Sequence, residues 1–169
     1  MKKASLVLVI VGLGLVLMAG SVFAANATAT STLTINATVA NTAKLTLGAA
    51  SISFADADPD LVASIPSVPA AVNVTASAKT TTSGAVGLTV KTSSDLTSGS
   101  DTILIPNVKW TASGAGFVAG TMDKTTGQSA GSWAGSGSRS GTFSYNLTNS
   151  WNYPTGSYAA TATYTLTSP

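Results

Sequence analysis

Residues 158–167 read YAATATYTLT, and apolar and hydroxyl-bearing side chains alternate through them. In an extended chain successive side chains point to opposite faces, so the apolar side chains share one face. That face consists of Tyr158, Ala160, Ala162, Tyr164 and Leu166. The other face is largely threonine, which is β-branched and suits a half-buried strand surface. The period of two predicts a β-strand that covers a core with one face.

The same alternation recurs along most of the preceding chain. It is present in residues 32–40, 44–47, 52–54, 72–79, 86–91, 103–110 and 143–147, with an interruption at Pro106. No apolar stripe of helical period follows residue 24. Such strands form sandwiches or barrels, and rows of alanine, valine and threonine are too small for the lipid-facing rows of a membrane barrel. We therefore predict an all-β fold, an antiparallel β-sandwich of about seven to nine strands.

Residues 112–141 have a different composition, because they contain eight of the sixteen glycines of the chain. Either short irregular strands or an excursion of the surface fits this composition. We predict a glycine-rich loop region over residues 112–141.

The chain begins with the features of a secretory signal peptide. Lys2 and Lys3 precede an apolar run of 13 residues at positions 6–18, and a V-x-A junction follows at residues 22–24. The run is shorter than the roughly 20 residues that a membrane-spanning helix needs. We therefore predict a signal peptide at residues 1–24 and a single β-sandwich domain at residues 25–169. We expect export to the cell surface or medium, through the periplasm in a Gram-negative cell, and no membrane segment after cleavage.

The composition excludes several kinds of chemistry. The chain contains no His, Cys or Glu, so it has no disulfide, no thiolate nucleophile, no imidazole base and no His/Cys metal site. Lys2 and Lys3 account for the formal charge of +2, because six basic and six acidic side chains follow them. A neutral mature chain without a basic cluster is not expected to bind nucleic acid. No pattern of a tuned nucleophile, acid or base is present, so we expect no enzyme and no catalytic residues.

Three stretches resemble secreted domains of the spore coat U-like family. They are residues 27–39 (ATATSTLTINATV), residues 51–54 (SISF) leading into Asp58-Pro59, and residues 153–158 (YPTGSY) followed by a threonine-rich strand. Subunits of archaic chaperone–usher pili use this domain, an Ig-like sandwich completed by the N-terminal strand of a neighbour. The resemblance implies an Ig-like fold, other filament subunits as partners, and a periplasmic chaperone and an usher. The chain departs from the family in lacking its cysteines and in having Ala55 after Phe54.

Residues 25–40 contain a strand whose place the sequence leaves open. Leu33, Ile35, Ala37 and Val39 form an apolar row with polar residues between them. Such a strand fits either the first position of its own sandwich or a neighbour's groove, where main-chain hydrogen bonds provide affinity and alternate side chains set the register. We predict a homo-oligomeric structural subunit of a surface filament, pilus or coat that assembles by non-covalent strand complementation. The alternative is a secreted carbohydrate- or surface-binding module.

Two groups of side chains are candidate ligand sites. Asp56, Asp58 and Asp60 are spaced by two around Pro59, and their carboxylates suit calcium, whereas the alternative is a solvated turn. No other cofactor is expected. Trp151 and Tyr153 lie on the same side of an extended chain and predict an aromatic ligand platform, whereas the alternative is packing in the core.

Overall fold

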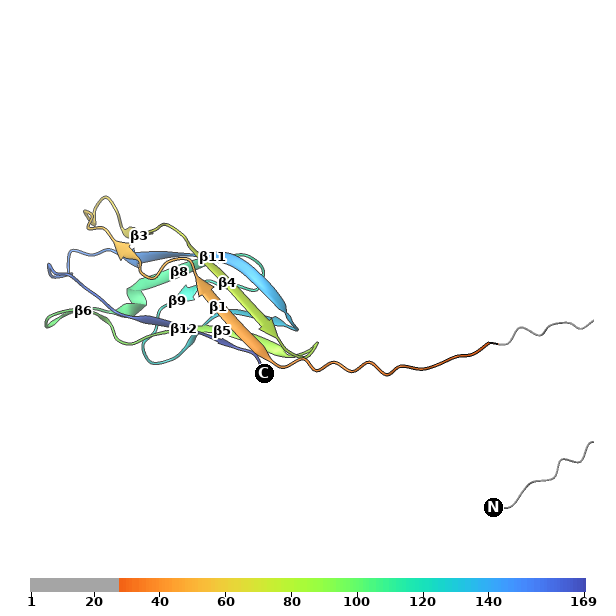
Figure 1. The fold of residues 1–169 in the computed structure, drawn as a ribbon. Coiled ribbons are helices and arrows are strands. Elements are labelled where there is room, and N and C mark those ends of the chain that lie inside the picture. Colours follow the sequence, from red (N-terminus) through yellow and green to blue (C-terminus); the bar gives the residue numbers. More distant parts are fainter. Residues whose placement is uncertain (1–27) are drawn as a thin grey trace, which may run out of the picture. The chain divides into compact units, whose positions relative to one another are not determined.

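The computed structural model of the chain describes residues 28–169 (Figure 1). The predicted signal peptide, residues 1–24, therefore lies outside the described residues. Within the described range the chain forms twelve β-strands and one short 3-10 helix, η1 (Ile105–Asn107). No helix in this range is long and apolar enough to cross a membrane. The predicted all-β fold is confirmed.

Seven strands form the larger sheet, which is organised around the long strand β11. They are β1 (Thr42–Leu47), β2 (Ser53–Phe54), β3 (Ser64–Val68), β4 (Val72–Lys79), β8 (Val108–Ser113), β9 (Gly120–Thr121) and β11 (Gly137–Thr148). Residues 137–143 of β11 pair with β4 and residues 146–148 pair with β3, so these two strands share one edge of β11. On the other edge, residues 142–147 pair with β8. β1 and β2 lie outside β4 and β3.

The smaller sheet has three strands in the order β10-β5-β12. They are β5 (Ala85–Thr92), β10 (Gln128–Ala134) and β12 (Ala162–Thr167), and β6 (Leu96–Ser98) and β7 (Asp101–Ile103) form a separate hairpin. All pairings in both sheets are antiparallel. The chain returns to the smaller sheet in its last strand, which places β12 beside the central β5.

The two sheets enclose one hydrophobic core, and the predicted alternation is confirmed along its inner strands. Along β4 and β5, every second side chain is buried and the intervening ones are exposed or half-buried. On the outer face of the larger sheet, hydroxyl groups pair across strands, as in the Ser77–Ser138 contact at 2.8 Å and the Ser113–Thr142 contact at 2.7 Å. The threonine and serine rows therefore face solvent, and the aliphatic rows face the core.

Aromatic side chains join the two sheets at the centre of this core. Phe143 on β11 stacks on Tyr164 of β12 with ring centroids 5.7 Å apart, and Phe117 meets Phe143 edge-on at 5.7 Å. The hydroxyl groups of Tyr145 and Tyr164 lie 2.6 Å apart. Such pairs contribute about 0.5–1.5 kcal/mol each beyond the burial of their area.

The prediction that residues 112–141 form a loop region is wrong. This stretch contains β9, β10 and the first residues of β11, and it buries Phe117 and Met122. Its glycines permit close approach between segments, because a Cβ on Gly120 would lie 2.4 Å from the Trp110 ring and one on Gly131 would lie 2.6 Å from the carbonyl oxygen of Gly116. Residues 112–141 pack against other segments of the domain and are therefore part of the sandwich. Amino-acid composition does not show such packing.

Two further differences concern strands, and one prediction is confirmed. The described residues contain twelve strands rather than seven to nine, because several strands have only two or three residues. Residues 64–68, for which no strand was predicted, form β3 and pair with β11. The 103–110 strand is interrupted as predicted: β7 ends at Ile103, and Pro106 lies in η1, where its missing N–H matters little.

We expect Phe143→Ala to lower the free energy of unfolding by about 3–5 kcal/mol, because it leaves a cavity between the sheets. Phe143 is 0% exposed and contacts the rings of Phe117, Tyr145 and Tyr164. Urea unfolding followed by circular dichroism measures the change. Ser144→Ala, on the outward face of β11, is the matched control and should change stability by less than about 0.5 kcal/mol. Equal effects of the two substitutions would contradict the assignment of faces.

Candidate functional site

One long side of the sandwich is closed by hydrogen bonds between β10 and the connection that precedes β9. The amide of Val118 donates to the carbonyl of Ala130 at 3.0 Å, and the amide of Ser132 donates to the carbonyl of Gly116 at 2.8 Å. The segment before β9 therefore covers the outer edge of β10. An edge covered in this way does not offer its backbone to another chain.

The opposite long side is formed by β1 and β12, and we call it the β1–β12 seam. Within residues 28–169, β1 pairs only with β4, and β12 pairs only with β5. The two strands run next to each other along this side of the domain (Figure 1). Each therefore presents one edge whose backbone N–H and C=O groups have no strand partner in the described chain.

The side chains that face inward at the seam are incompletely covered. Leu45 and Leu47 of β1, and Tyr164 and Leu166 of β12, are half-buried and pack against the core. The corresponding inward residues of the inner strands are closed off, with Val74 and Val90 each 1% exposed. The seam thus combines a free strand edge with apolar side chains that are partly accessible to water.

Tyr164 holds β12 to the core although the outer edge of this strand is free. Its ring stacks on Phe143, and its hydroxyl group contacts that of Tyr145. Burial raises the pKa of both tyrosines, so both hydroxyl groups stay protonated in ordinary buffers. The position of β12 at the seam is therefore set by contacts within the domain and does not depend on a partner.

The end of β12 is fastened where β1 begins. The Asn41 side-chain amide and the Thr80 hydroxyl group donate to the carbonyl oxygen of Pro169 at 2.6 and 2.8 Å. The Ser168 hydroxyl group donates to the carbonyl oxygen of Lys79 at 3.0 Å. β12 therefore finishes at the same end of the domain from which residue 41 leaves β1.

Residues 28–41 form no strand in this structure. Leu33 and Ile35 are each 85% exposed, and Val39 is 74% exposed. Residues 32–40 form no strand of the described structure, and the choice between a place in their own sandwich and a neighbour's groove stays a prediction. Each large apolar side chain left in water forgoes about 1.5–3 kcal/mol that burial would provide.

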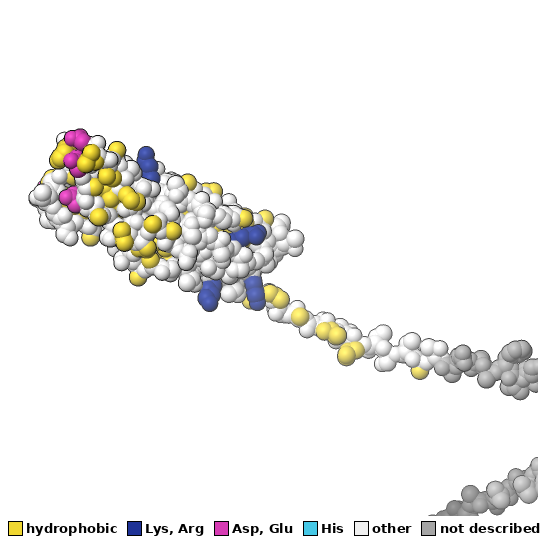
Figure 2. Space-filling view, turned by 90° about the horizontal axis from the view of Figure 1, so that it is seen from above, with side chains coloured by type: hydrophobic (Ala, Val, Ile, Leu, Met, Phe, Trp, Pro, Cys, Tyr) yellow, Lys and Arg dark blue, Asp and Glu magenta, His cyan; other side chains and the backbone are white. Residues whose placement is uncertain are grey.

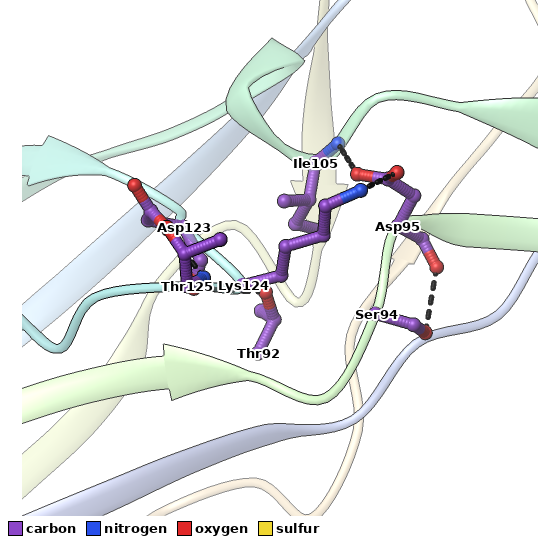
Figure 3. A network of polar contacts seen from close by, with 7 residues as sticks. All are labelled: Thr92, Ser94, Asp95, Ile105, Asp123, Lys124 and Thr125. Carbon is purple, nitrogen blue, oxygen red and sulfur yellow. Dashed lines mark hydrogen bonds and ion pairs between the residues drawn. The ribbon is translucent and has the colours of Figure 1, made fainter.

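The polar network of Figure 3 is structural, and the sequence did not single it out. The buried carboxylate of Asp95 accepts a hydrogen bond from the amide of Ile105 at 2.9 Å and forms an ion pair with Lys124. The Ile105 hydrogen bond, followed by the Lys124 contact, holds the pKa of Asp95 below its usual value. This network ties the chain after β5 to η1 and to the chain after β9.

Asp123, next to Lys124, stabilises a turn. Its carboxylate accepts hydrogen bonds from the hydroxyl group and amide of Thr125, both at 2.6 Å, and from the amide of Thr126 at 3.0 Å. These bonds, led by that of the Thr125 hydroxyl group, lower the pKa of Asp123 to about 2. Its carbonyl oxygen accepts from the amide of Thr92 at 2.9 Å, so the turn is anchored to β5.

The structure does not bring Asp56, Asp58 and Asp60 together as a metal site. They lie in the loop between β2 and β3, where the carboxylate of Asp58 accepts from the amide of Asp60 at 2.9 Å. The carboxylate of Asp60 accepts from the indole N–H of Trp151 at 3.0 Å. In the part of the chain that the structure describes, no three acidic side chains form a group that could hold a metal ion. This geometry corresponds to the turn alternative.

Trp151 and Tyr153 have different environments in the loop that follows β11. Trp151 is 68% exposed. Tyr153 is half-buried against the core, and its hydroxyl group donates to the carbonyl oxygen of Thr148 at 2.9 Å. Only Trp151 therefore offers its ring freely to a ligand.

Comparison with protein-family models, with curated proteins and with solved structures finds no match to this chain. The geometry itself defines an antiparallel β-sandwich that is closed along one side, unpaired along the other, and preceded by an exposed alternating segment.

We expect Asp95→Asn to lower stability near neutral pH by about 1–3 kcal/mol, because it weakens a buried charge-assisted contact. The pKa of Asp95 is lower in the folded chain than its usual 3.8, so the ionised group stabilises the fold above that pH. This contribution is lost as the pH falls through the folded-state pKa. The variant should therefore lose less stability than the unaltered protein between about pH 6 and pH 2.5.

Urea midpoints across this pH range measure the effect. Asp56→Asn, which changes an exposed carboxylate, is the control and should leave the profile unchanged. An Asp95→Asn profile parallel to that of the unaltered protein would exclude the assigned role of Asp95.

Proposed function

We propose that this protein is an exported, non-catalytic structural subunit of a surface filament, pilus or coat. Residues 33–39 of one copy insert along the β1–β12 seam of another. The observation that carries the proposal is the presence, in one chain, of an unpaired strand edge with half-buried apolar side chains and an exposed alternating segment. The resemblance of the termini to spore coat U-like domains, and the Ig-like architecture it implies, support the same function.

The dimensions and chemistry of the two parts agree. The apolar row spans seven residues, from Leu33 to Val39, and β12 has six. At about 3.3 Å per residue both extend for about 20 Å. An inserted strand directs its apolar row onto Leu45 and Leu166 and its threonines outward, which matches the two faces of the sandwich.

The direction of the strands favours another copy over the same chain. β12 ends where residue 41 enters β1, as the Asn41–Pro169 hydrogen bond shows. To reach its own seam, the N-terminal segment must reverse at residue 41 and then runs parallel to β12. A segment from another copy needs no reversal at residue 41 and is free to run antiparallel to β12, which is parallel to β1. Exchange that does not close on itself then generates a filament.

Removal of residues 25–40 should abolish polymerisation and leave a folded monomer, because no buried core residue belongs to residues 28–40. Size-exclusion chromatography and negative-stain microscopy measure assembly, and circular dichroism measures folding. A synthetic peptide of residues 28–40 should bind the shortened chain and raise its melting temperature. Filaments formed by the shortened chain would overturn the proposal.

Ile35→Asp should reduce polymerisation at least tenfold, because a carboxylate cannot be buried along the seam without a large desolvation cost. Thr34→Asp adds the same charge on the outward row and is the matched control, with little effect expected. Light scattering under identical conditions compares the two variants. Equal inhibition by both would mean that charge on the segment, rather than insertion of its apolar row, controls assembly.

A further inference from the structure

The described domain separates its side-chain charges along its length, although it has equal numbers of acidic and basic groups. We define the basic end as the start of β1, the end of β4 and the start of β11, which carry Lys44, Lys79 and Arg139 and no carboxylate side chain among the described residues. All six aspartates lie toward the other end of the domain. Asp56, Asp58 and Asp60 follow β2, Asp95 follows β5, Asp101 is in β7, and Asp123 follows β9. Three lysines also lie toward that end, so acidic groups outnumber basic ones there. Figure 2 shows carboxylates at one tip, one cationic side chain near that tip, and further cationic side chains toward the other end of the domain.

The acidic end also carries exposed apolar side chains. Leu61 is 82% exposed and Trp151 is 68% exposed. The indole N–H of Trp151 donates to the carboxylate of Asp60, so the ring and the charge belong to one surface. We call Leu61, Trp151 and Asp60 the apolar tip; hydrophobic and acidic side chains lie side by side at this end in Figure 2.

The basic end has a complementary hollow. It has a volume of about 490 Å³ and is lined by residues that include Lys44, Ser77, Ala78, Lys79 and Gly137. It therefore lies between β1, β4 and the start of β11, and two lysines border it. A protruding apolar tip with carboxylates suits a hollow with cationic rims.

We propose that the acidic end of one copy docks on the basic end of the next, with the apolar tip at the Lys44–Lys79 hollow, and that this contact sets the polarity of assembly. The inference deepens the proposed function and rests on it. Its occupant is a second copy of this chain. Because the tip and the hollow lie at different ends of the domain, the contact is heterologous, and it propagates as an open filament when the rotation between copies does not close a ring.

The short connection between Val39 and β1 brings the basic end of the donor copy close to one end of the acceptor copy. That end is the one at which the donated segment leaves the seam. Only three residue steps separate Val39 from Thr42, a distance of about 10 Å in extended chain. When the donated segment runs antiparallel to β12, it leaves the seam at the acidic end of the acceptor, and opposite charges meet. When it runs parallel, it leaves at the basic end, and like charges meet. The charge separation therefore selects the antiparallel direction.

Exposed charges act mainly on the rate of association and are screened by salt. Steering by complementary charges raises association rates by roughly 10–10³-fold. Its range falls from about 30 Å at 0.01 M salt to about 3 Å at 1 M. Assembly should therefore slow with added salt.

The first test reverses the charges at one end. Lys44→Glu with Lys79→Glu should slow polymerisation about tenfold or more at 0.01 M salt and have little effect at 1 M, where charges are screened. Lys91→Glu with Lys109→Glu makes the same change of net charge away from the basic end and is the matched control. Adding Asp56→Lys and Asp60→Lys to the reversed chain should restore the rate, since the two ends are again opposite.

The peptide of residues 28–40 separates this inference from the proposed function. The peptide carries no charged side chain, so it should bind shortened chains with and without the reversed lysines equally. If it binds none of them, strand complementation itself fails. The end contact is excluded by two results together. The peptide binds all the shortened chains, and the full chains with and without the reversed lysines polymerise at the same rate and with the same salt dependence.

The second test reads the polarity directly. The chain has no cysteine, so single-cysteine variants form unambiguous disulfides. A Val39→Cys chain should crosslink with an Ala162→Cys chain, because the antiparallel direction places Val39 near the start of β12. It should crosslink far less with a Leu166→Cys chain. The reverse preference would overturn the inferred polarity and leave complementation itself intact.

Discussion

The structure depends on β11, the longest described strand, which pairs with three other strands of the larger sheet. β4 and β3 share one edge of β11, and β8 occupies the other, so the sheet has no continuity without it. Its inward row of Phe143, Tyr145 and Leu147 also fills the centre of the sandwich. Tyr145 and Phe143 reach Tyr164 on β12, so the same strand positions the smaller sheet.

The two outer strands of the smaller sheet, β10 and β12, differ in whether their outer edges are covered. The β10 edge is covered by the chain around Val118, whereas the β12 edge has no partner within the described residues. Free edges with apolar side chains are sites of uncontrolled association in most proteins. Here an exposed segment with the same alternation precedes β1. In the assembly that we propose, this segment is the specific partner of the free edge. Tyr164 is held to the core by Phe143 and Tyr145.

The distribution of charged side chains over the domain says more about association between copies than the net charge does. Equal numbers of acidic and basic side chains follow residue 24, which by itself indicates only low repulsion between copies. The fold gathers three of the cations at one end and the six carboxylates toward the other. Among those carboxylates, Asp95 and Asp123 serve the internal network, whereas Asp60 lies beside an exposed indole.

The sequence alone determined the all-β class, the positions of most long strands and the face that each one presents. Alternation is a local property, since successive side chains of a strand point to opposite sides wherever that strand lies. It therefore located β4, β5 and β12 without knowledge of their partners. It also identified residues 33–39 as a strand-like row.

Only the tertiary structure decided what depends on contacts between distant residues. The glycine-rich stretch joined the sandwich because Gly131 lets the chain at Gly116 approach, and the carboxylate of Asp95 acquired its role from Ile105 and Lys124. Nor does alternation show whether a strand has a neighbour on each edge. Residues 33–39 and 162–167 carry similar patterns, yet one lies exposed and the other is held by the core. Pairing depends on which edges meet in space, and this information is absent from any single strand.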